Sequence, residues 1–285
     1  MSDDAPFLRH APAAAPLPLV LDSPHSGERY PEDFDHAPPL AEIRRAEDTH
    51  VARLWRGALR HGATLIEACF PRAYIDPNRS LDDLDPDLLA EAWDGPLVRS
   101  RKTEQGIGLV WRLARGGVPM YSRKLRADEI RRRIDDFYLP YHAALAAEID
   151  ALHGRFGAVW HIDCHSMPAV GDVNSDDPGR KRADFVLGDR DGTTCAAEFT
   201  GTVAAALRGF GYDVAINDPY KGVEIVRRHG RPASGRHSLQ IEINRRLYMD
   251  EATLAPNAGY TALEADLDRL AGALALFVQT RCSGR

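Results

Sequence analysis

Short apolar segments alternate with longer segments of helical periodicity along most of the chain. Two of the short segments, Ala158–Ile162 and Phe185–Leu187, are largely continuous apolar runs, which are typical of strands covered on both faces. The predicted strands are Leu17–Asp22, Ala63–Ala68, Gly108–Leu113, Ala158–Asp163, Ala183–Leu187, Tyr212–Ile216 and Ser238–Asn244.

The helical segments lie between these strands. Apolar side chains recur at helical spacing in Leu40–His61, Ala127–His153, Thr193–Leu207 and Leu263–Val278. Pro140 should kink or restart the second helix, because proline removes a backbone donor. The alternation predicts an α/β fold with a central, mixed but mostly parallel sheet flanked by helices.

Two polar segments, Leu81–Pro96 and Val170–Lys181, are interrupted by Pro and Gly and are predicted either as site loops or as ordinary surface loops. The second is also a candidate lid over an active site. Residues 1–16 are rich in Ala and Pro and are expected to form a flexible leader, and no linker divides residues 17–285. We therefore expect a single domain over 17–285.

Charge and cysteine content narrow the class of protein. The 36 Lys and Arg residues against 42 Asp and Glu give a net charge of −6, which argues against a nucleic-acid partner. The four cysteines are widely spaced, so reduced thiols in the cytoplasm fit better than a disulfide framework. The longest apolar stretch, Leu270–Val278, is about half of what a membrane span needs, so no membrane partner is expected.

Polar side chains follow four of the predicted strands. In open α/β sheets, ligands bind beyond the carboxyl ends of the strands. His25 follows the first strand, Asn78 and Arg79 follow the second, His165 follows the fourth, and Glu242 lies in the last. Because these residues span most of the chain, they can meet only if nearly the whole chain folds around one sheet.

Two histidines and one carboxylate are the usual protein ligands of a hydrolytic zinc site, which keeps a fourth position for water. Asp48 is the leading carboxylate if it lies on the apolar side of the first helix, but it could instead cap a helix that begins near residue 48. Glu28, three residues after His25, competes with Asp48 as the carboxylate ligand. Asp163 is spaced to orient His165, since side chains two residues apart on a strand share a face.

Glu242 is flanked by Ile241 and Ile243 and faces away from them, either toward solvent or into a cleft. In a cleft it could act as a general base.

Arg79, Arg227, Arg245 and Arg246 offer guanidinium groups that bind carboxylates. Neither a dinucleotide fingerprint, a phosphate-binding loop nor a GxSxG nucleophile elbow is present in the sequence.

These motifs together resemble the N-formylglutamate amidohydrolase family, in order from about residue 18 to residue 251. The matching segments are Ser23–Gly27, Glu47–Val51, Tyr74–Arg79, Pro140–His142, Asp163–Ser166, Pro219–Gly222 and Gln240–Arg245. The resemblance implies a fold like that of the zinc carboxypeptidases and aspartoacylase. It also implies hydrolysis of N-formyl-L-glutamate to formate and glutamate in histidine breakdown.

By this resemblance, His25 and His165 match histidine ligands of zinc and Glu242 matches the catalytic glutamate. Asn78 and Arg79 match an Asn-Arg pair that holds a substrate carboxylate. Asp48 falls where the carboxylate ligand is expected, with Glu28 and Glu47 as alternatives. The sequence departs from the family pattern after Gly222, where Val223 replaces an expected second glycine.

The resulting hypothesis is a single-domain amidohydrolase that binds one Zn²⁺ through His25, Asp48 and His165. Arg245 or Arg227 would hold the second carboxylate of a small, acidic N-acyl amino acid. The alternatives are a deacylase for another such substrate, for example an N-acyl aspartate, and a non-catalytic carboxylate-binding protein on the same scaffold. The sequence leaves the oligomeric state open.

Overall fold

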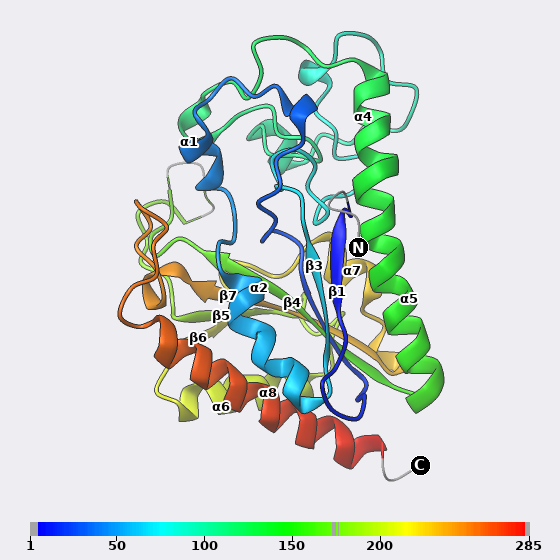
Figure 1. The fold of residues 1–285 in the computed structure, drawn as a ribbon, viewed down its shortest axis with the longest axis vertical. Coiled ribbons are helices and arrows are strands. Elements are labelled where there is room, and N and C mark those ends of the chain that lie inside the picture. The colour runs from blue at the N-terminus through cyan, green and yellow to red at the C-terminus, as the bar shows by residue number, and fades with distance from the viewer. Residues whose placement is uncertain (1–4, 173–174, 176, 283–285) are drawn as a thin grey trace. The chain divides into compact units, whose positions relative to one another are not determined.

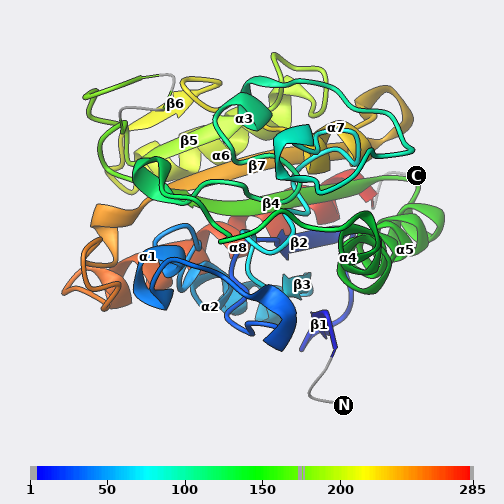
Figure 2. The same ribbon diagram turned by 90° about the horizontal axis from the view of Figure 1, so that it is seen from above.

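The computed structural model of the chain describes residues 5–172, 175 and 177–282. Its strands form one sheet in the order β1-β3-β2-β4-β7-β5-β6, which can be followed across the view in Figure 2. The strands are β1 (Phe7–His10), β2 (Leu19–Ser23), β3 (Thr64–Ala68), β4 (Val159–Met167), β5 (Phe185–Gly188), β6 (Val214–Ile216) and β7 (Arg236–Asn244).

The sheet is mixed and mostly parallel, as predicted. β2 pairs in parallel with β3 and β4, and the β4–β7 and β5–β6 pairs are parallel too. The β5–β7 pair is antiparallel and makes the sheet mixed. β1 lies within residues 1–16, which were expected to form a flexible leader, and Phe7 and Leu8 give it apolar side chains at the sheet edge.

The predicted strand at Gly108–Leu113 is wrong. The backbone there bonds to loop residues instead of to a neighbouring strand: Leu109 N–H donates to the Asp83 carbonyl, and the Leu109 carbonyl accepts from Asp76 N–H, both at 2.7 Å. Gly108 permits this close approach, because a Cβ at that position would lie 2.3 Å from the Asp83 oxygen. An apolar run alone does not distinguish a buried loop from a strand.

The helices cover the predicted segments with one clear difference. They are α1 (Leu40–Arg44), α2 (Val51–Leu54), α3 (Arg101–Glu104), α4 (Ala127–Arg133), α5 (Leu139–Phe156), α6 (Ala197–Gly209), α7 (Glu224–His229) and α8 (Tyr260–Cys282). The predicted single helix over Leu40–His61 is wrong, because a turn at residues 45–50 separates α1 from α2. His50 has a left-handed backbone at φ 71°, which a continuous helix cannot contain.

The predicted restart near Pro140 takes the form of a π-helical turn. Residues Ile134–Tyr138 form this turn between α4 and α5. Such turns accommodate a local break in the i→i−4 ladder, and Pro140 lacks the N–H that a regular ladder requires. α5 then runs to Phe156 and is followed by Gly157 at φ 74°, the left-handed conformation common after a helix C-terminus.

The chain divides into two compact units. The first comprises Pro24–Thr49, Ala68–Ala144 and the described residues up to Leu8. The second comprises Arg9–Ser23, His50–Glu67 and the described residues from Leu145 onward, and so contains most of the sheet. The expectation of one domain over residues 17–285 stays a prediction.

The second unit has a sheet with two different buried faces. On one face, Ile162, Leu239 and Ile241 pack into an apolar core with side chains of α6 and α8. Figure 1 shows these two helices along that face of the sheet. In the middle of both strands, over residues 161–165 of β4 and 238–242 of β7, the side chains of the opposite parity are polar and buried: His161, Asp163, His165, Ser238, Gln240 and Glu242. Because alternate residues of a strand point to opposite faces, this pattern concentrates buried polar groups on one side of the sheet.

No helix in the described part of the chain has both the length and the apolar character that a membrane crossing requires. The four cysteines are free thiols. Part of the candidate lid at Val170–Lys181, namely residues 173, 174 and 176, lies outside the described residues.

Candidate metal centre and active site

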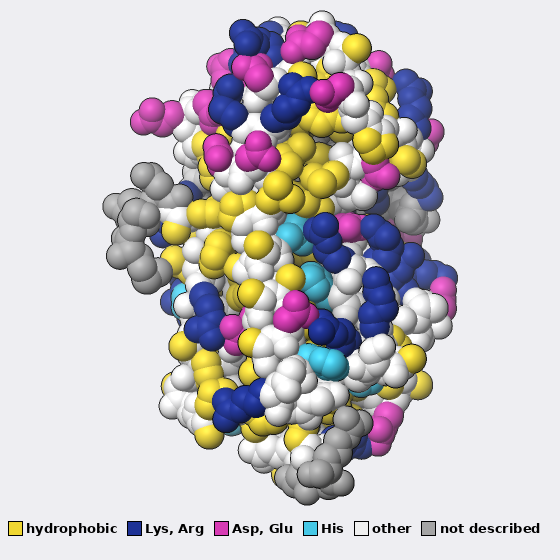
Figure 3. All heavy atoms as spheres, turned by 90° about the vertical axis from the view of Figure 1, so that its right-hand side faces the viewer, with side chains coloured by type: hydrophobic (Ala, Val, Ile, Leu, Met, Phe, Trp, Pro, Cys, Tyr) yellow, Lys and Arg dark blue, Asp and Glu magenta, His cyan; other side chains and the backbone are white. Residues whose placement is uncertain are grey.

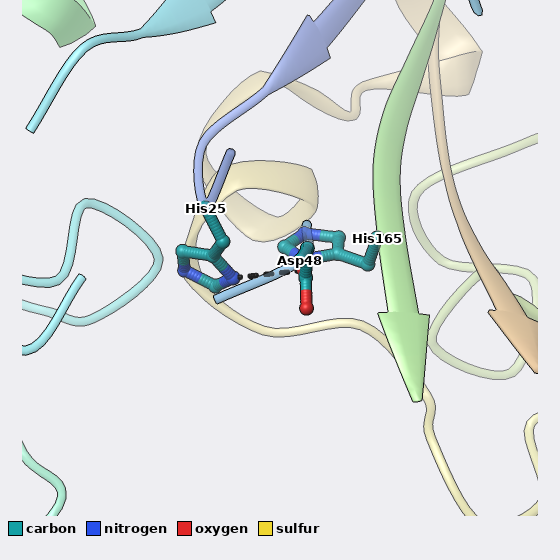
Figure 4. Close-up of side chains that lie close together, drawn as sticks. All are labelled: His25, Asp48 and His165. Atoms are coloured by element: carbon teal, nitrogen blue, oxygen red, sulfur yellow. Dashed lines mark ion pairs between the residues drawn. The ribbon is translucent and has the colours of Figure 1, made fainter. Parts of the chain in front are cut away.

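His25, Asp48 and His165 come together in one buried cluster (Figure 4). Each offers one ligand atom, and these atoms all lie within 4.8 Å of one another. His25 Nδ1 is 3.4 Å from Asp48 Oδ2. Each residue is at most 2% exposed, so the cluster is screened from bulk water.

His25 lies two residues beyond the end of β2, in a turn that packs closely against the backbone of residues 69 and 70. A Cβ at Gly27 would lie 2.2 Å from the Phe70 carbonyl oxygen, so only glycine fits there. The Nε2 atom of His25 is 2.7 Å from Asp76 Oδ1. This contact leaves Nδ1 as the ring nitrogen that faces Asp48.

Asp76 organises the surroundings of His25. Its second carboxylate oxygen accepts from the Arg72 guanidinium at 2.9 and 3.2 Å, and Oδ1 also accepts from the Asn78 N–H at 2.9 Å. Burial alone would raise the pKa of Asp76, but Arg72, His25 and Arg79 hold that pKa well below its usual value. One ionised carboxylate therefore links His25 to the segment that carries Asn78 and Arg79.

Asp48 lies in the turn before α2, which differs from both placements considered for it from the sequence. It is neither on the apolar side of a long helix nor a cap, since α2 begins at Val51 without a side-chain cap. Its N–H donates to the His25 carbonyl at 2.9 Å, which ties the two candidate ligands together.

The two alternative carboxylates have other partners. Glu47 accepts from the Tyr30 hydroxyl and from Arg44, and burial raises its pKa. Glu28 is about half exposed and pairs with Arg44 at 3.0 Å. This geometry favours Asp48 as the carboxylate ligand.

His165 lies near the end of β4, and its Nε2 atom is 2.6 Å from Asp163 Oδ1. As with His25, a buried carboxylate contacts the Nε2 atom of the ring. Such carboxylate–histidine pairs fix the orientation of a metal-binding ring. The register pairs His165 with Glu242 on β7, which brings the candidate general base beside a candidate ligand.

Glu242 has neighbours that the sequence motifs did not identify as site residues. Gln240 donates to Glu242 Oε1 at 2.9 Å. Burial and the nearby Glu242 carboxylate raise the pKa of the Tyr220 hydroxyl. The Arg182 guanidinium lies over the Tyr220 ring at 5.1 Å and forms a buried ion pair with Asp177 at 2.7 Å.

The predicted substrate-binding arginines have different surroundings. Arg79 is buried and donates to the carbonyls of Ile107 and Asn78. Arg245 is buried and donates to the Ser166 hydroxyl at 3.1 Å, directly after His165. Arg227 pairs with Glu224 on α7, and its side chain is 56% exposed. Lys and Arg side chains gather near histidines on the surface in Figure 3, although the net charge is −6.

The fold and these contacts define an α/β protein with a candidate metal centre beside a buried glutamate. The N-formylglutamate amidohydrolase family model matches residues 17–249, and the chain belongs to this family. That assignment confirms the resemblance inferred from the sequence motifs.

Known proteins similar to this chain agree with the family. The N-formylglutamate deformylase of Pseudomonas putida is 31% identical over 247 residues, which cover 82% of this chain and 83% of that protein. The enzyme of the same name from Pseudomonas aeruginosa is 32% identical over 243 residues, with the same coverage. The crystal structure of N-formylglutamate amidohydrolase from Ralstonia eutropha JMP134 is 49% identical, with a TM-score of 0.93, and covers 97% of this chain and 99% of that chain.

Proposed function

We propose that this protein is a zinc-dependent enzyme that hydrolyses N-formyl-L-glutamate to formate and L-glutamate. The observation that carries the proposal is the convergence of His25, Asp48 and His165 in a chain of the N-formylglutamate amidohydrolase family. Glu242, paired in register with His165, supplies the acid–base group that amide hydrolysis needs.

The donor set fits zinc. Two imidazole nitrogens and one carboxylate oxygen are ligands that zinc accepts in hydrolytic sites with an open position. Asp76 and Asp163 contact the Nε2 atoms of the two rings, and the Nδ1 atom of His25 faces Asp48. When bound, a zinc ion supplies Lewis-acid chemistry that polarises a carbonyl and makes water a better nucleophile.

Glu242 performs the proton transfers in this mechanism. Its carboxylate takes a proton from the water that attacks the formyl carbon. It then gives the proton to the glutamate nitrogen as the C–N bond breaks, so the products are formate and the free amine. Asp76 and Asp163 hold His25 and His165 in place throughout.

Two arginines would bind the two carboxylates of an acidic substrate. We assign one substrate carboxylate to Arg79 with Asn78, and the other to Arg245. Arg245 is favoured over Arg227 because it is buried and bonded to Ser166, whereas Arg227 is largely exposed. Guanidinium groups bind carboxylates through paired hydrogen bonds, which sets both orientation and side-chain length.

The substrate assignment is tested by comparing hydrolysis of N-formylglutamate, N-formylaspartate and N-acetylglutamate under the same conditions. Formate release is measured for the first two compounds and acetate release for the third. We expect kcat/KM to be at least about tenfold higher for N-formylglutamate, because a missing methylene or an added methyl group costs about 1–3 kcal/mol in a fitted pocket. A preference for N-formylaspartate would favour the deacylase alternative. Binding without turnover of any substrate would favour the carboxylate-binding protein.

A further inference from the structure

Gln240 is a buried polar residue that contacts Glu242. It is 2% exposed and lies two residues before Glu242 on β7, so both side chains share the polar face of the sheet. Its Nε2 atom donates to Glu242 Oε1 at 2.9 Å. The amide must turn its NH₂ group to the carboxylate, because two facing oxygens would repel each other.

The other end of the Gln240 amide has no such contact. Its Oε1 atom is buried and has no hydrogen-bond partner among the described residues. The neighbours contribute to this: β5 places Gly188 opposite Gln240, and Gly222 lies close enough that a Cβ there would be 3.7 Å from the Gln240 Cβ. Glycines offer no side chain that could donate to the amide oxygen.

This arrangement lowers stability. A buried acceptor without a partner costs about 1–3 kcal/mol, and an apolar residue at position 240 would avoid that cost. Most buried polar groups in proteins have a hydrogen-bond partner, and the exceptions are expected at residues that the function requires. Because the amide group of Gln240 donates to Glu242, the function of Gln240 is expected to concern the Glu242 carboxylate.

We propose that Gln240 is a positioning residue for Glu242: it holds one carboxylate oxygen so that the other faces the attacking water. This inference rests on the proposed function and adds a determinant of the catalytic rate to it. The N–H···O contact fixes the rotation of the carboxylate about its terminal bond, a torsion that otherwise has only a broad preference. A base that is misoriented by about 1 Å loses about 10²-fold in rate.

The test is Gln240→Met, which keeps the length of the side chain and removes the donor. The matched control is Gln279→Met on the exposed surface of α8. We expect kcat for formate release from N-formylglutamate to fall about 10- to 100-fold, while KM, zinc content and inhibition by L-glutamate stay within about twofold. Thermal stability should be unchanged or higher, and Gln240→Glu should be slower than Gln240→Met.

An unchanged kcat in Gln240→Met would overturn the inference, as would a loss that appears in KM or zinc content. If Gln240→Met does not fold, Gln240→Leu provides the same comparison. If the wild type itself releases no formate from N-formylglutamate, the proposed function fails, and this outcome is seen in the wild-type arm before any variant is compared.

Discussion

Replacement of Glu242 by glutamine is expected to lower kcat for formate release by about 10³-fold. General acid–base groups contribute about 10²–10⁴-fold, and the amide of glutamine cannot take a proton from water. The substitution preserves the shape of the side chain, so zinc content and inhibition by L-glutamate should match those of the wild type. Steady-state kinetics with metal analysis on the same samples provide the measurement.

Glu32→Gln is the control for this substitution, because Glu32 is exposed on the surface. It should leave kcat and KM unchanged. If Glu242→Gln hydrolyses N-formylglutamate at the wild-type rate with full zinc content, the acid–base role of Glu242 is wrong.

The second large effect is expected at the candidate metal ligands. Asp48→Asn should weaken zinc binding by more than about 100-fold, because it removes the only negative charge among the three ligands. Asp76→Asn should weaken it less, by about 10- to 100-fold, since Asp76 acts by orienting His25. Competition with a metal-binding dye measures both affinities.

Glu28→Gln is the matched control for this series, since Glu28 is the exposed carboxylate that competes with Asp48 in the sequence. Its zinc affinity should equal that of the wild type. Loss of zinc in Glu28→Gln together with retention in Asp48→Asn would show that the wrong carboxylate has been assigned.

Much of the sheet could be predicted from the sequence, because its strands are short apolar runs between helical segments. The antiparallel placement of β5 against β7 could not, since periodicity carries no information on strand direction. The helix predicted over Leu40–His61 is interrupted by the turn at residues 45–50, in which His50 has a left-handed backbone and its Nε2 atom lies 2.9 Å from the Leu254 carbonyl oxygen. That partner lies 204 residues away, beyond the reach of local pattern.

For the candidate site, too, contacts between residues far apart in the sequence could not be predicted. Residue type, strand ends and the family resemblance predict His25, Asp48 and His165 as ligands, and the structure brings them together. The role of Asp76 is not visible in the sequence, because its contact with His25 joins residues 51 positions apart. Asp163 is easier to identify, since it is two residues from His165 on the same strand.

The central claim is tested most directly by measuring formate release from N-formylglutamate in three states of the protein: before metal removal, after removal, and after the return of one equivalent of Zn²⁺. We expect activity in the purified protein, its loss when the metal is removed, and its recovery with zinc. Full activity in a protein verified to be metal-free would contradict the proposed mechanism.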